Sequence, residues 1–225
     1  MAKEKLKHKI FLIEDHPITR DGFAQLINYQ DDLVVCGHAG SAAKALAVIE
    51  ASQPGLVIVD VSLPDAHGIE LIKDLIARQP NLRILVLSMH DEALYAERAL
   101  RAGAKGYVMK QESTEIVMGA IRKVLLGGTH LSARMQERAL QVFAGEAATA
   151  GRSGVERLTD RELEVFELIG RGQSTREISS QLHLSVSTVE TYRAHLKEKL
   201  QLSSGTELTH RAIEWVSRQE TRATG

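Results

Sequence analysis

Five short apolar segments alternate with amphipathic segments over the first 127 residues, and this alternation restricts the fold more than any other feature. The apolar segments cover residues 9–13, 33–39, 56–60, 83–88 and 106–110. A short continuous apolar run bounded by turn residues is typical of a strand buried on both faces of a parallel sheet. Strands that alternate with helices indicate an α/β fold with helices on both faces. We therefore predict a doubly wound, five-stranded parallel sheet.

Helices are predicted in the intervals between these strands. The clearest are residues 17–29, 68–78, 91–102 and 114–126, with a further one beginning after Ser41. Ser41 and Ser113 are expected to cap the helices that follow them, and Gly103 is expected to close the helix over 91–102.

Polar side chains stand at the carboxyl ends of four of the strands. Right-handed crossovers bring these ends to one edge of the sheet, where α/β proteins bind ligands. The residues gathered there would be Glu14, Asp15, Asp60, Ser88 and Lys110. Three clustered carboxylates repel one another, and a hard divalent cation such as Mg²⁺ would neutralise them. Each residue alone could start a turn or cap a helix, so the prediction depends on their combination.

Composition is that of an ordinary globular protein, with 44% hydrophobic and 25% charged residues. A chain of 225 residues can form two domains of about 100 residues each. The apolar runs are far shorter than the roughly 20 residues needed to cross a bilayer, and no signal peptide is visible. The single cysteine, Cys36, cannot form an internal disulfide. We expect a cytoplasmic protein with no membrane partner.

The middle of the chain has the composition of a connection. A helix is predicted within residues 129–143, and a small, polar, Gly-containing stretch follows at 145–154. That stretch is typical of a flexible linker. The predicted division is one domain over 1–127, a helix and linker over 128–155, and a second domain over 156–225.

Four Ser/Thr-x-x-Glu patterns occur in the second domain. Such a capping box satisfies the free amides at a helix start. The four pairs are Thr159/Glu162, Ser174/Glu177, Ser187/Glu190 and Ser204/Glu207. They predict an all-α domain of four helices, although Ser185 is an alternative third cap. The short turn between the second and third helices is typical of a helix-turn-helix.

The third predicted helix, residues 186–200, has a face suited to DNA. On a helical projection the side opposite the core carries Ser187, Thr191, Ala194 and Glu198. Arg193 and Lys197 flank that side and suit phosphates, as Arg176 does from the preceding helix. The net charge of −1 does not indicate a nucleic-acid-binding protein, so this function depends on the local pattern. The fourth helix is expected at about 204–217.

The first 125 residues resemble the receiver domains of two-component response regulators. The resemblance depends on Glu14-Asp15, Asp60 with Leu63-Pro64 and Gly68, Ser88, Tyr107 and Lys110. It implies a flavodoxin-like fold in which Asp60 accepts a phosphoryl group from a histidine kinase.

The resemblance also implies roles for the residues around Asp60. The implied Mg²⁺ ligands are Glu14, acting mainly through water, Asp15, Asp60 and the backbone carbonyl of Ser62. The implied switch residues are Ser88 and Tyr107, and Lys110 would pair with the phosphoryl group. Ser62 and His90 stand two residues beyond Asp60 and Ser88, where they would tune dephosphorylation.

Residues 156–208 resemble the LuxR-type DNA-binding domain. The matching residues are Leu158-Thr159, Arg161-Glu162, Glu164-Val165, Gly172, Glu177-Ile178, Leu184-Ser185, Thr188-Val189 and Lys199-Leu200. The whole chain therefore resembles a NarL/FixJ-type response regulator, a transcription regulator rather than an enzyme. The resemblance implies a histidine kinase and double-stranded promoter DNA as partners, a homodimer after phosphorylation, and RNA polymerase as a further candidate partner.

The residues expected at DNA are Arg176, Ser187, Glu190, Thr191, Arg193, Ala194 and Lys197. Glu190 stands where many family members have Lys, and Gly205 stands where Arg or Asn is common. A carboxylate that faces DNA must accept a hydrogen bond from cytosine or be held away. The operator of a better-known member therefore cannot be assumed for this chain.

Other classes of function agree with parts of the pattern. A receiver-containing protein-interaction module that does not read DNA would be consistent with Glu190 and the neutral charge. An Asp-nucleophile phosphohydrolase is disfavoured, because dehalogenase-type phosphatases need a D-x-D pair and residues 60–62 are Asp-Val-Ser. A nucleotide-binding enzyme is disfavoured because no strand is followed by a Gly-rich phosphate loop.

Overall fold

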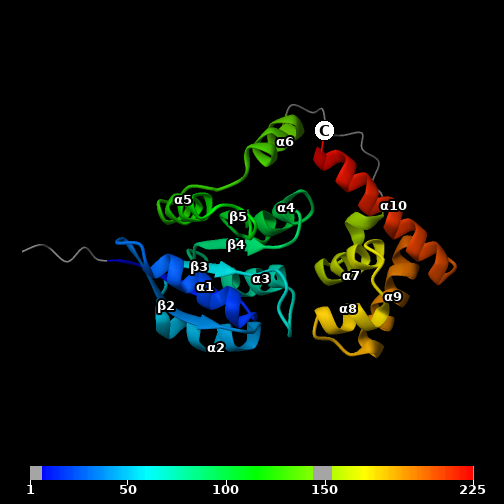
Figure 1. Ribbon diagram of the computed structural model, residues 1–225, viewed down its shortest axis with the longest axis horizontal. Helices are drawn as coiled ribbons and strands as arrows, with labels where there is room; N and C mark the ends of the chain where they lie inside the picture. Colours follow the sequence, from blue (N-terminus) through cyan, green and yellow to red (C-terminus); the bar gives the residue numbers. More distant parts are fainter. Residues whose placement is uncertain (1–6, 144–153, 225) are drawn as a thin grey trace, which may run out of the picture. The chain divides into compact units, whose positions relative to one another are not determined.

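The computed structural model describes residues 7–143 and 154–224 of the chain. The chain divides into two compact units, residues 1–148 and 149–225. The first contains a sheet and helices, and the second is helical (Figure 1).

A five-stranded sheet forms the centre of the first unit. Its strands are β1 (His8–Ile13), β2 (Leu33–Ala39), β3 (Leu56–Val59), β4 (Ile84–Ser88) and β5 (Gly106–Met109). They pair in the order β2-β1-β3-β4-β5, and every pair is parallel. The doubly wound fold class predicted from the sequence is therefore confirmed.

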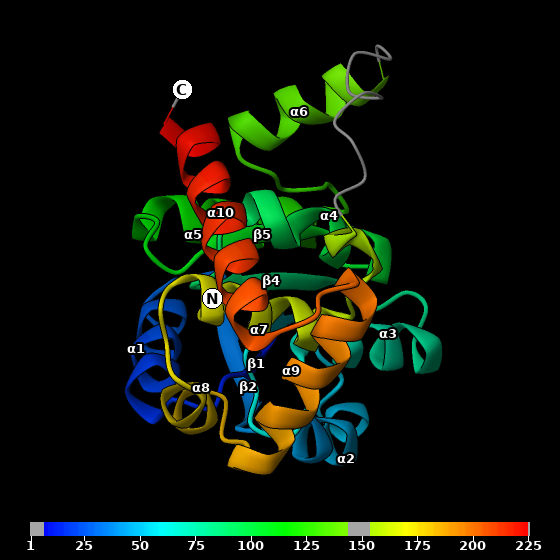
Figure 2. The same ribbon diagram turned by 90° about the vertical axis from the view of Figure 1, so that its right-hand side faces the viewer.

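Five helices cover the two faces of this sheet: α1 (Pro17–Asn28), α2 (Ala42–Ser52), α3 (Gly68–Arg78), α4 (Glu92–Ala102) and α5 (Thr114–Leu125). Helices α1 and α5 lie on one face, and α2 and α3 lie on the other (Figure 2). On the first face Ile27 and Ile121 pack with Leu12 and Ile58 in one buried apolar cluster. Because successive strand residues point to opposite faces, Phe11 and Val57 are buried toward the other face.

Local signals set most helix ends in this unit. The hydroxyl of Ser41 accepts a hydrogen bond from the amide of Lys44, and Asp91 caps α4 through the amide of Ala93. Gly103 closes α4 with a φ of 113°, a left-handed conformation that favours glycine.

Ser113 stands at the N-cap of α5, but its side chain makes no capping hydrogen bond there. The prediction for Ser113 is therefore correct in the position of the cap, and wrong in that the side chain does not form the capping hydrogen bond.

The chain after α5 returns to the sheet. The amide of Tyr107 donates to the carbonyl of His130 at 3.2 Å, and the amide of His130 donates to the carbonyl of Lys105 at 2.9 Å. The hydroxyl of Ser132 then donates to Glu92 at the start of α4. Helix α6 (Ala133–Phe143) follows, which agrees with the helix predicted within 129–143. Nearly all of the predicted linker, residues 145–153, lies outside the described residues.

The second unit is all-α, as predicted. A short 3₁₀ turn (Val155–Arg157) precedes α7 (Asp160–Gly170), α8 (Thr175–Gln181), α9 (Val186–Leu200) and α10 (Gly205–Thr224). Val189 and Leu196 of α9 are fully buried, and Phe166 packs against Trp215 with ring centroids 5.5 Å apart. Helix α10 extends beyond the end predicted at residue 217.

Two of the four predicted capping boxes form as expected, those of Thr159/Glu162 and Ser174/Glu177. The third is wrong, because Ser185 has the extended backbone of an N-cap and accepts from the amide of Thr188. The fourth forms only in part. Ser204 accepts from the amide of Glu207, but the Glu207 carboxylate accepts from the amide of Ser203 instead.

No helix within residues 7–143 and 154–224 is both long enough and apolar enough to cross a membrane.

Candidate functional site

Asp60 follows directly after β3, and its side chain is buried. Its amide donates to the carbonyl of Ile13 at 2.9 Å, which fixes the end of β3 against the end of β1. The turn after Asp60 closes tightly, since the amide of Gly68 donates to the carbonyl of Val61 at 2.6 Å. A Cβ atom at Gly68 would lie 2.1 Å from the carbonyl oxygen of Asp60. Only glycine therefore allows this return of the chain.

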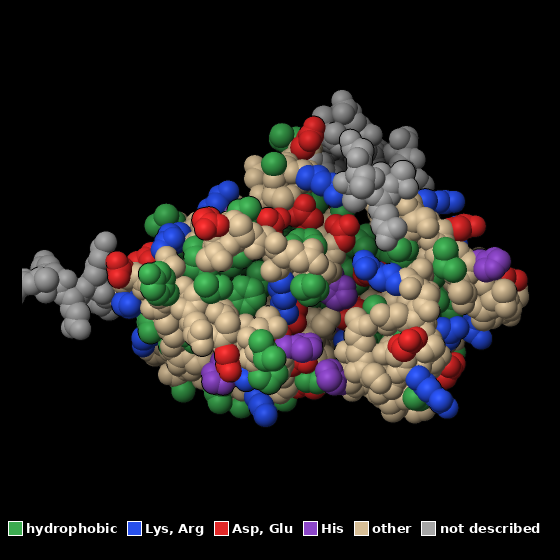
Figure 3. All heavy atoms as spheres, viewed as in Figure 1, with side chains coloured by type: hydrophobic (Ala, Val, Ile, Leu, Met, Phe, Trp, Pro, Cys, Tyr) green, Lys and Arg blue, Asp and Glu red, His purple; other side chains and the backbone are tan. Residues whose placement is uncertain are grey.

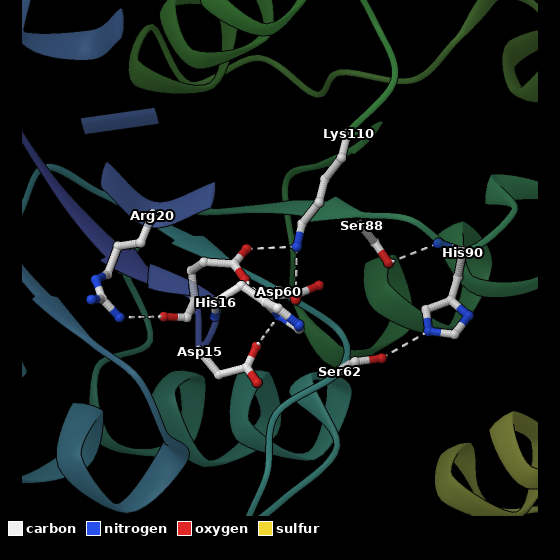
Figure 4. A network of polar contacts seen from close by, with 9 residues as sticks. Asp15, His16, Arg20, Asp60, Ser62, Ser88, His90 and Lys110 are labelled. Atoms are coloured by element: carbon white, nitrogen blue, oxygen red, sulfur yellow. Dashed lines mark hydrogen bonds and ion pairs between the residues drawn. The ribbon is translucent and has the colours of Figure 1, made fainter. Parts of the chain in front are cut away.

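Lys110 connects two of the carboxylates. Its Nζ lies 2.8 Å from Oδ2 of Asp60 (Figure 4). The same nitrogen lies 2.6 Å from Oε2 of Glu14. Lys110 is positioned by the end of β5, where its amide donates to the carbonyl of Ser88. All three side chains are less than 10% exposed, so this is a buried ionic cluster.

Burial and neighbouring charges shift the pKa values of Asp60 and Lys110. Burial raises the pKa of Asp60 to about 6, against the lowering effect of the Lys110 charge and with a further rise from Glu14. Burial lowers the pKa of Lys110, but the charges of Asp60 and Glu14 raise it more, so that it lies above its usual value. Asp60 is therefore mostly a carboxylate at neutral pH, and one whose charge is poorly solvated.

Asp15 and His16 form the rim of the site, where Asp15 is half-buried and His16 is exposed. Oδ1 of Asp15 lies 2.9 Å from Nδ1 of His16, and the backbone amide of His16 donates to Oε1 of Glu14. On the other side Arg20 donates to the backbone carbonyl of Glu14 at 3.2 Å. His16 and Arg20 were not predicted from the sequence. The position of His16 directly after two acidic residues was the only signal for it.

The donor set of this edge fits a divalent cation. Glu14 and Asp15 each present a carboxylate oxygen, and these atoms and a nitrogen of His16 lie within 4.8 Å of one another. With Asp60 the edge holds three carboxylates for the one ammonium of Lys110, which leaves an excess of negative charge in a partly desolvated site. Hard oxygen ligands with uncompensated charge suit Mg²⁺.

A second polar chain lies beside Asp60. Oγ of Ser62 lies 2.8 Å from Nε2 of His90, and the amide of His90 donates to Oγ of Ser88 at 3.1 Å. The hydroxyl of Tyr107 donates to the carbonyl of His90 at 2.8 Å, and its ring is buried. His90 therefore connects three positions that the sequence singled out separately.

In the helical unit, α9 exposes the side chains of Ser187, Glu190, Thr191 and Ala194. Arg176 of α8 is exposed, and Arg193 and Lys197 are half-buried. Within the described part of the chain none of these three cations forms an ion pair. Figure 3 shows basic and acidic side chains interspersed on the visible surface, in agreement with the net charge of −1.

Comparison with known proteins assigns both units to one family. The response regulator receiver domain matches residues 10–122, and the luxR family of bacterial regulatory proteins matches residues 156–212. The transcriptional activator protein ExaE of Pseudomonas putida is 38% identical over 206 residues, which cover 91% of this chain and 95% of ExaE. The oxygen regulatory protein NreC of Staphylococcus carnosus is 34% identical over 209 residues, 91% of this chain and 96% of NreC.

The chain belongs to the LuxR-type response regulators. These are transcription regulators and not enzymes, so the regulator has the NarL/FixJ-type organisation predicted from its sequence. The structure of RcsB from Salmonella enterica serovar Typhimurium, bound to promoter rprA in the presence of phosphomimetic BeF₃⁻, shares its fold. That likeness has a TM-score of 0.59 at 22% identity and covers 92% of this chain and 98% of RcsB. Response regulators pair with histidine kinases and bind promoter DNA, and receiver domains generally bind Mg²⁺ at their phosphorylation site.

One carboxylate of the regulator has a role that sequence analysis missed. Asp65, in the turn after β3, accepts from the amides of Ala42 and Ala43 at 2.8 and 2.9 Å. Burial raises the pKa of Asp65, but these hydrogen bonds lower it more, so that it lies below its usual value. Asp65 thus caps α2 and ties the turn that follows Asp60 to a neighbouring helix. No local pattern indicates this contact, because more than 20 residues separate the partners.

Proposed function

We propose that this protein is a phosphorylation-switched transcription regulator in which Asp60 accepts a phosphoryl group from the phosphohistidine of a histidine kinase. The observation that carries the proposal is the buried contact of 2.8 Å between Asp60 and Lys110, beside the carboxylates of Glu14 and Asp15. A nucleophile with poorly solvated charge, next to a fixed cation, is suited to phosphoryl transfer.

The transfer exchanges one bond for another. An oxygen of the Asp60 carboxylate attacks phosphorus while the P–N bond of phosphohistidine breaks. The electron pair of that bond stays on the imidazole, which takes a proton from solvent. Lys110 neutralises a phosphoryl oxygen during the displacement. Mg²⁺ would be held by Glu14, Asp15, Asp60 and the backbone carbonyl of Ser62, where it would neutralise the remaining phosphoryl charge.

The polar chain at His90 is the proposed switch. In the structure Ser88 accepts from the amide of His90, and Tyr107 donates to the carbonyl of the same residue. A phosphoryl group on Asp60 offers Ser88 a stronger, charged acceptor. Reorientation of Ser88 would change the contacts of His90 and Tyr107 together. Such a coupled change can shift the population of two receiver states.

The shifted receiver would favour a homodimer that binds promoter DNA through α9. Arg176, Arg193 and Lys197 have no ion-pair partner among the described residues, and they are proposed to contact phosphates. Ser187, Glu190, Thr191 and Ala194 are exposed on α9 and are proposed to face the bases. A dimer would place two such helices on two half-sites. RNA polymerase at the same promoter is the remaining proposed partner, and a promoter-binding role places the protein in the cytoplasm.

The test uses the whole chain with Mg²⁺ and acetyl phosphate as the phosphodonor. Three proteins are compared: wild type, Asp60→Ala, and Asp31→Ala as the matched control at an exposed aspartate. Intact mass reports phosphoryl incorporation, size-exclusion chromatography reports the dimer, and selection from a random duplex library reports DNA binding.

We expect wild type and Asp31→Ala to gain a phosphoryl group, to dimerise and to bind DNA in a salt-dependent manner. Asp60→Ala should do none of these in response to acetyl phosphate. If Asp60→Ala accepts the phosphoryl group, dimerises and binds as wild type does, the proposal is wrong. If phosphorylated wild type binds no duplex, the protein-interaction alternative is favoured.

A further inference from the structure

A carboxylate is exposed on the helix that is proposed to enter the DNA. Glu190 lies in the second turn of α9, on the same exposed side as Ser187 and Thr191. DNA phosphates repel a carboxylate, so a glutamate here needs a specific compensating partner. In the major groove the base edge that offers a donor to Glu is the exocyclic amino group of cytosine.

Glu190 is held in place by the neighbouring helix. The hydroxyl of Thr175, the first residue of α8, donates to Oε1 of Glu190 at 2.9 Å. Within the described part of the chain Oε2 has no hydrogen-bond partner. The contact therefore fixes one oxygen of the carboxylate and leaves the other available as an acceptor.

The hydroxyls of Thr191 and Ser187, near Glu190, are already engaged in local contacts within α9 and with its N-cap. The hydroxyl of Thr191 donates to the carbonyl of Ser187 at 3.0 Å, and Oγ of Ser187 lies 2.8 Å from Oγ of Ser185. Hydroxyls that serve local contacts discriminate weakly between bases, because a hydroxyl can both donate and accept. Glu190 is acceptor-only when ionised, so it carries the strongest base preference of these exposed side chains.

We infer that Glu190 selects a cytosine in each half-site of the operator and that Thr175 is a positioning residue for this selection. This inference rests on the proposed function, since it requires α9 to read DNA. Oε2 of Glu190 accepts from the N4 amino group of cytosine, while Thr175 holds Oε1. The immobilised side chain does not have to be ordered when DNA binds, and a preorganised contact of this kind discriminates better than a mobile one.

The test is a selection from a random duplex library with the whole chain, Mg²⁺ and acetyl phosphate. The variants are Glu190→Gln, Glu190→Ala, Thr175→Val and Thr175→Ser, with Thr209→Val as the matched control in α10. Valine keeps the shape of threonine and lacks the hydroxyl, whereas serine keeps the hydroxyl. The salt dependence of total binding is measured for every variant and reports whether the phosphate contacts remain.

We expect wild type to prefer cytosine at one fixed position of each half-site by about five- to tenfold. Glu190→Gln should change this preference to adenine, which glutamine recognises through N6 and N7, and Glu190→Ala should abolish it. Thr175→Val should reduce the preference by about threefold while the salt dependence stays unchanged, because one hydrogen bond is lost. Thr175→Ser and Thr209→Val should retain it.

The outcomes separate the two proposals. If phosphorylated wild type binds no duplex, the proposed function fails and this inference fails with it. If wild type selects a defined operator that Glu190→Gln and Glu190→Ala select unchanged, only the reading by Glu190 is overturned. If both Glu190 variants change the selection and Thr175→Val does not, the positioning role of Thr175 is overturned.

Discussion

Lys110 Nζ lies 2.8 Å from Oδ2 of Asp60, although 50 residues separate the two in the chain. The acid follows β3 and the amine follows β5, so the contact passes over the end of β4, the strand between them. The pair is buried and shares the ammonium with Glu14. An incoming phosphoryl group would therefore meet a cation whose position is fixed by the sheet and needs no rearrangement.

The raised pKa of Asp60 predicts a pH-dependent cost of folding. In the folded protein this pKa rises from 3.8 to about 6, so the stability that Asp60 contributes is complete below pH 3.8 and is lost as pH rises through 6. Asp60→Asn cannot ionise and should raise the free energy of unfolding by about 1–3 kcal/mol at pH 8. The gain should shrink at pH 5. Urea denaturation in EDTA, followed by circular dichroism, measures both values, and an equal gain at both pH values would contradict the prediction.

Removal of Lys110 should leave two buried carboxylates without their cation. We expect Lys110→Met to lower the free energy of unfolding by about 3 kcal/mol at pH 8, because breaking a buried pair costs more than the pair contributes. The loss should be smaller at pH 5, where Asp60 is largely protonated. Millimolar Mg²⁺ should restore part of it through binding to the folded state.

Lys105→Met is the control for this charge, since Lys105 is exposed, and it should change stability by less than about 0.5 kcal/mol. A thermal shift titration with MgCl₂ measures the rescue. Equal losses for the two lysine variants would show that the buried cluster does not depend on Lys110.

Gly68 should tolerate no side chain. A Cβ atom there would lie 2.1 Å from the Asp60 carbonyl oxygen, so Gly68→Ala must displace the backbone of the proposed phosphoacceptor. We expect a loss of about 2–4 kcal/mol in stability and a parallel loss of phosphoryl incorporation from acetyl phosphate. Gly119→Ala is the matched control, because Gly119 lies within α5 with nothing within 4 Å of its Cβ position. That change should stabilise by about 0.5–1 kcal/mol.

Ser62 and His90 should control how long the phosphoryl group lasts. Oγ of Ser62 lies 2.8 Å from Nε2 of His90, and both residues belong to the polar chain beside Asp60. Ser62→Ala and His90→Ala each remove this contact, and we expect a roughly two- to tenfold change in phosphate release. Phosphoryl incorporation should change less. Ser180→Ala, at an exposed serine of α8, is the control. An unchanged release rate in both variants would exclude the role.

The start of α9 should depend on Ser185 and not on Ser187. Ser185 accepts from the amide of Thr188, so Ser185→Ala should cost about 1 kcal/mol of helical-unit stability. Ser187→Ala should cost less than about 0.5 kcal/mol, since Ser187 lies inside the helix. The single tryptophan, Trp215, packs on Phe166, and its fluorescence during urea denaturation reports on this unit. A larger loss of stability in Ser187→Ala than in Ser185→Ala would support the Ser187/Glu190 capping box predicted from the sequence.

Most of the fold could be predicted because it depends on signals within a few residues. The strand Leu33–Ala39 and the helices Gly68–Arg78 and Val186–Leu200 have the predicted bounds, since turn residues, caps and apolar periodicity mark their ends. The sequence also predicted that Glu14, Asp60 and Lys110 lie close together. This prediction needs only the rule that the carboxyl ends of parallel strands meet at one edge of the sheet, and it does not depend on the details of packing.

Contacts between distant segments could not be predicted in the same way. Asp65 looks like a turn residue in sequence, and only the folded chain brings it to the amides of α2. The contact from Thr175 to Glu190 joins two helices, so neither residue indicates the other. The third capping box failed for a related reason. Ser185 and Ser187 both satisfy the local preference, and the angle at which the turn enters α9 decides between them.

The return of the chain at His130 bears on how the sheet of the receiver avoids pairing edge to edge with other molecules. Strand β5 is at one border of the sheet, and an uncovered border offers amides and carbonyls to strands of other molecules. The backbone of His130 occupies the carbonyl of Lys105 and the amide of Tyr107, and so blocks this template. A receiver fragment that ends at residue 127, the boundary predicted from the sequence, would lose that cover. Its edge strand β5 would then expose unpaired amides and carbonyls. A fragment that continues through residue 132 keeps the His130 backbone on β5. The few residues after α5 thereby protect the sheet against edge-to-edge aggregation.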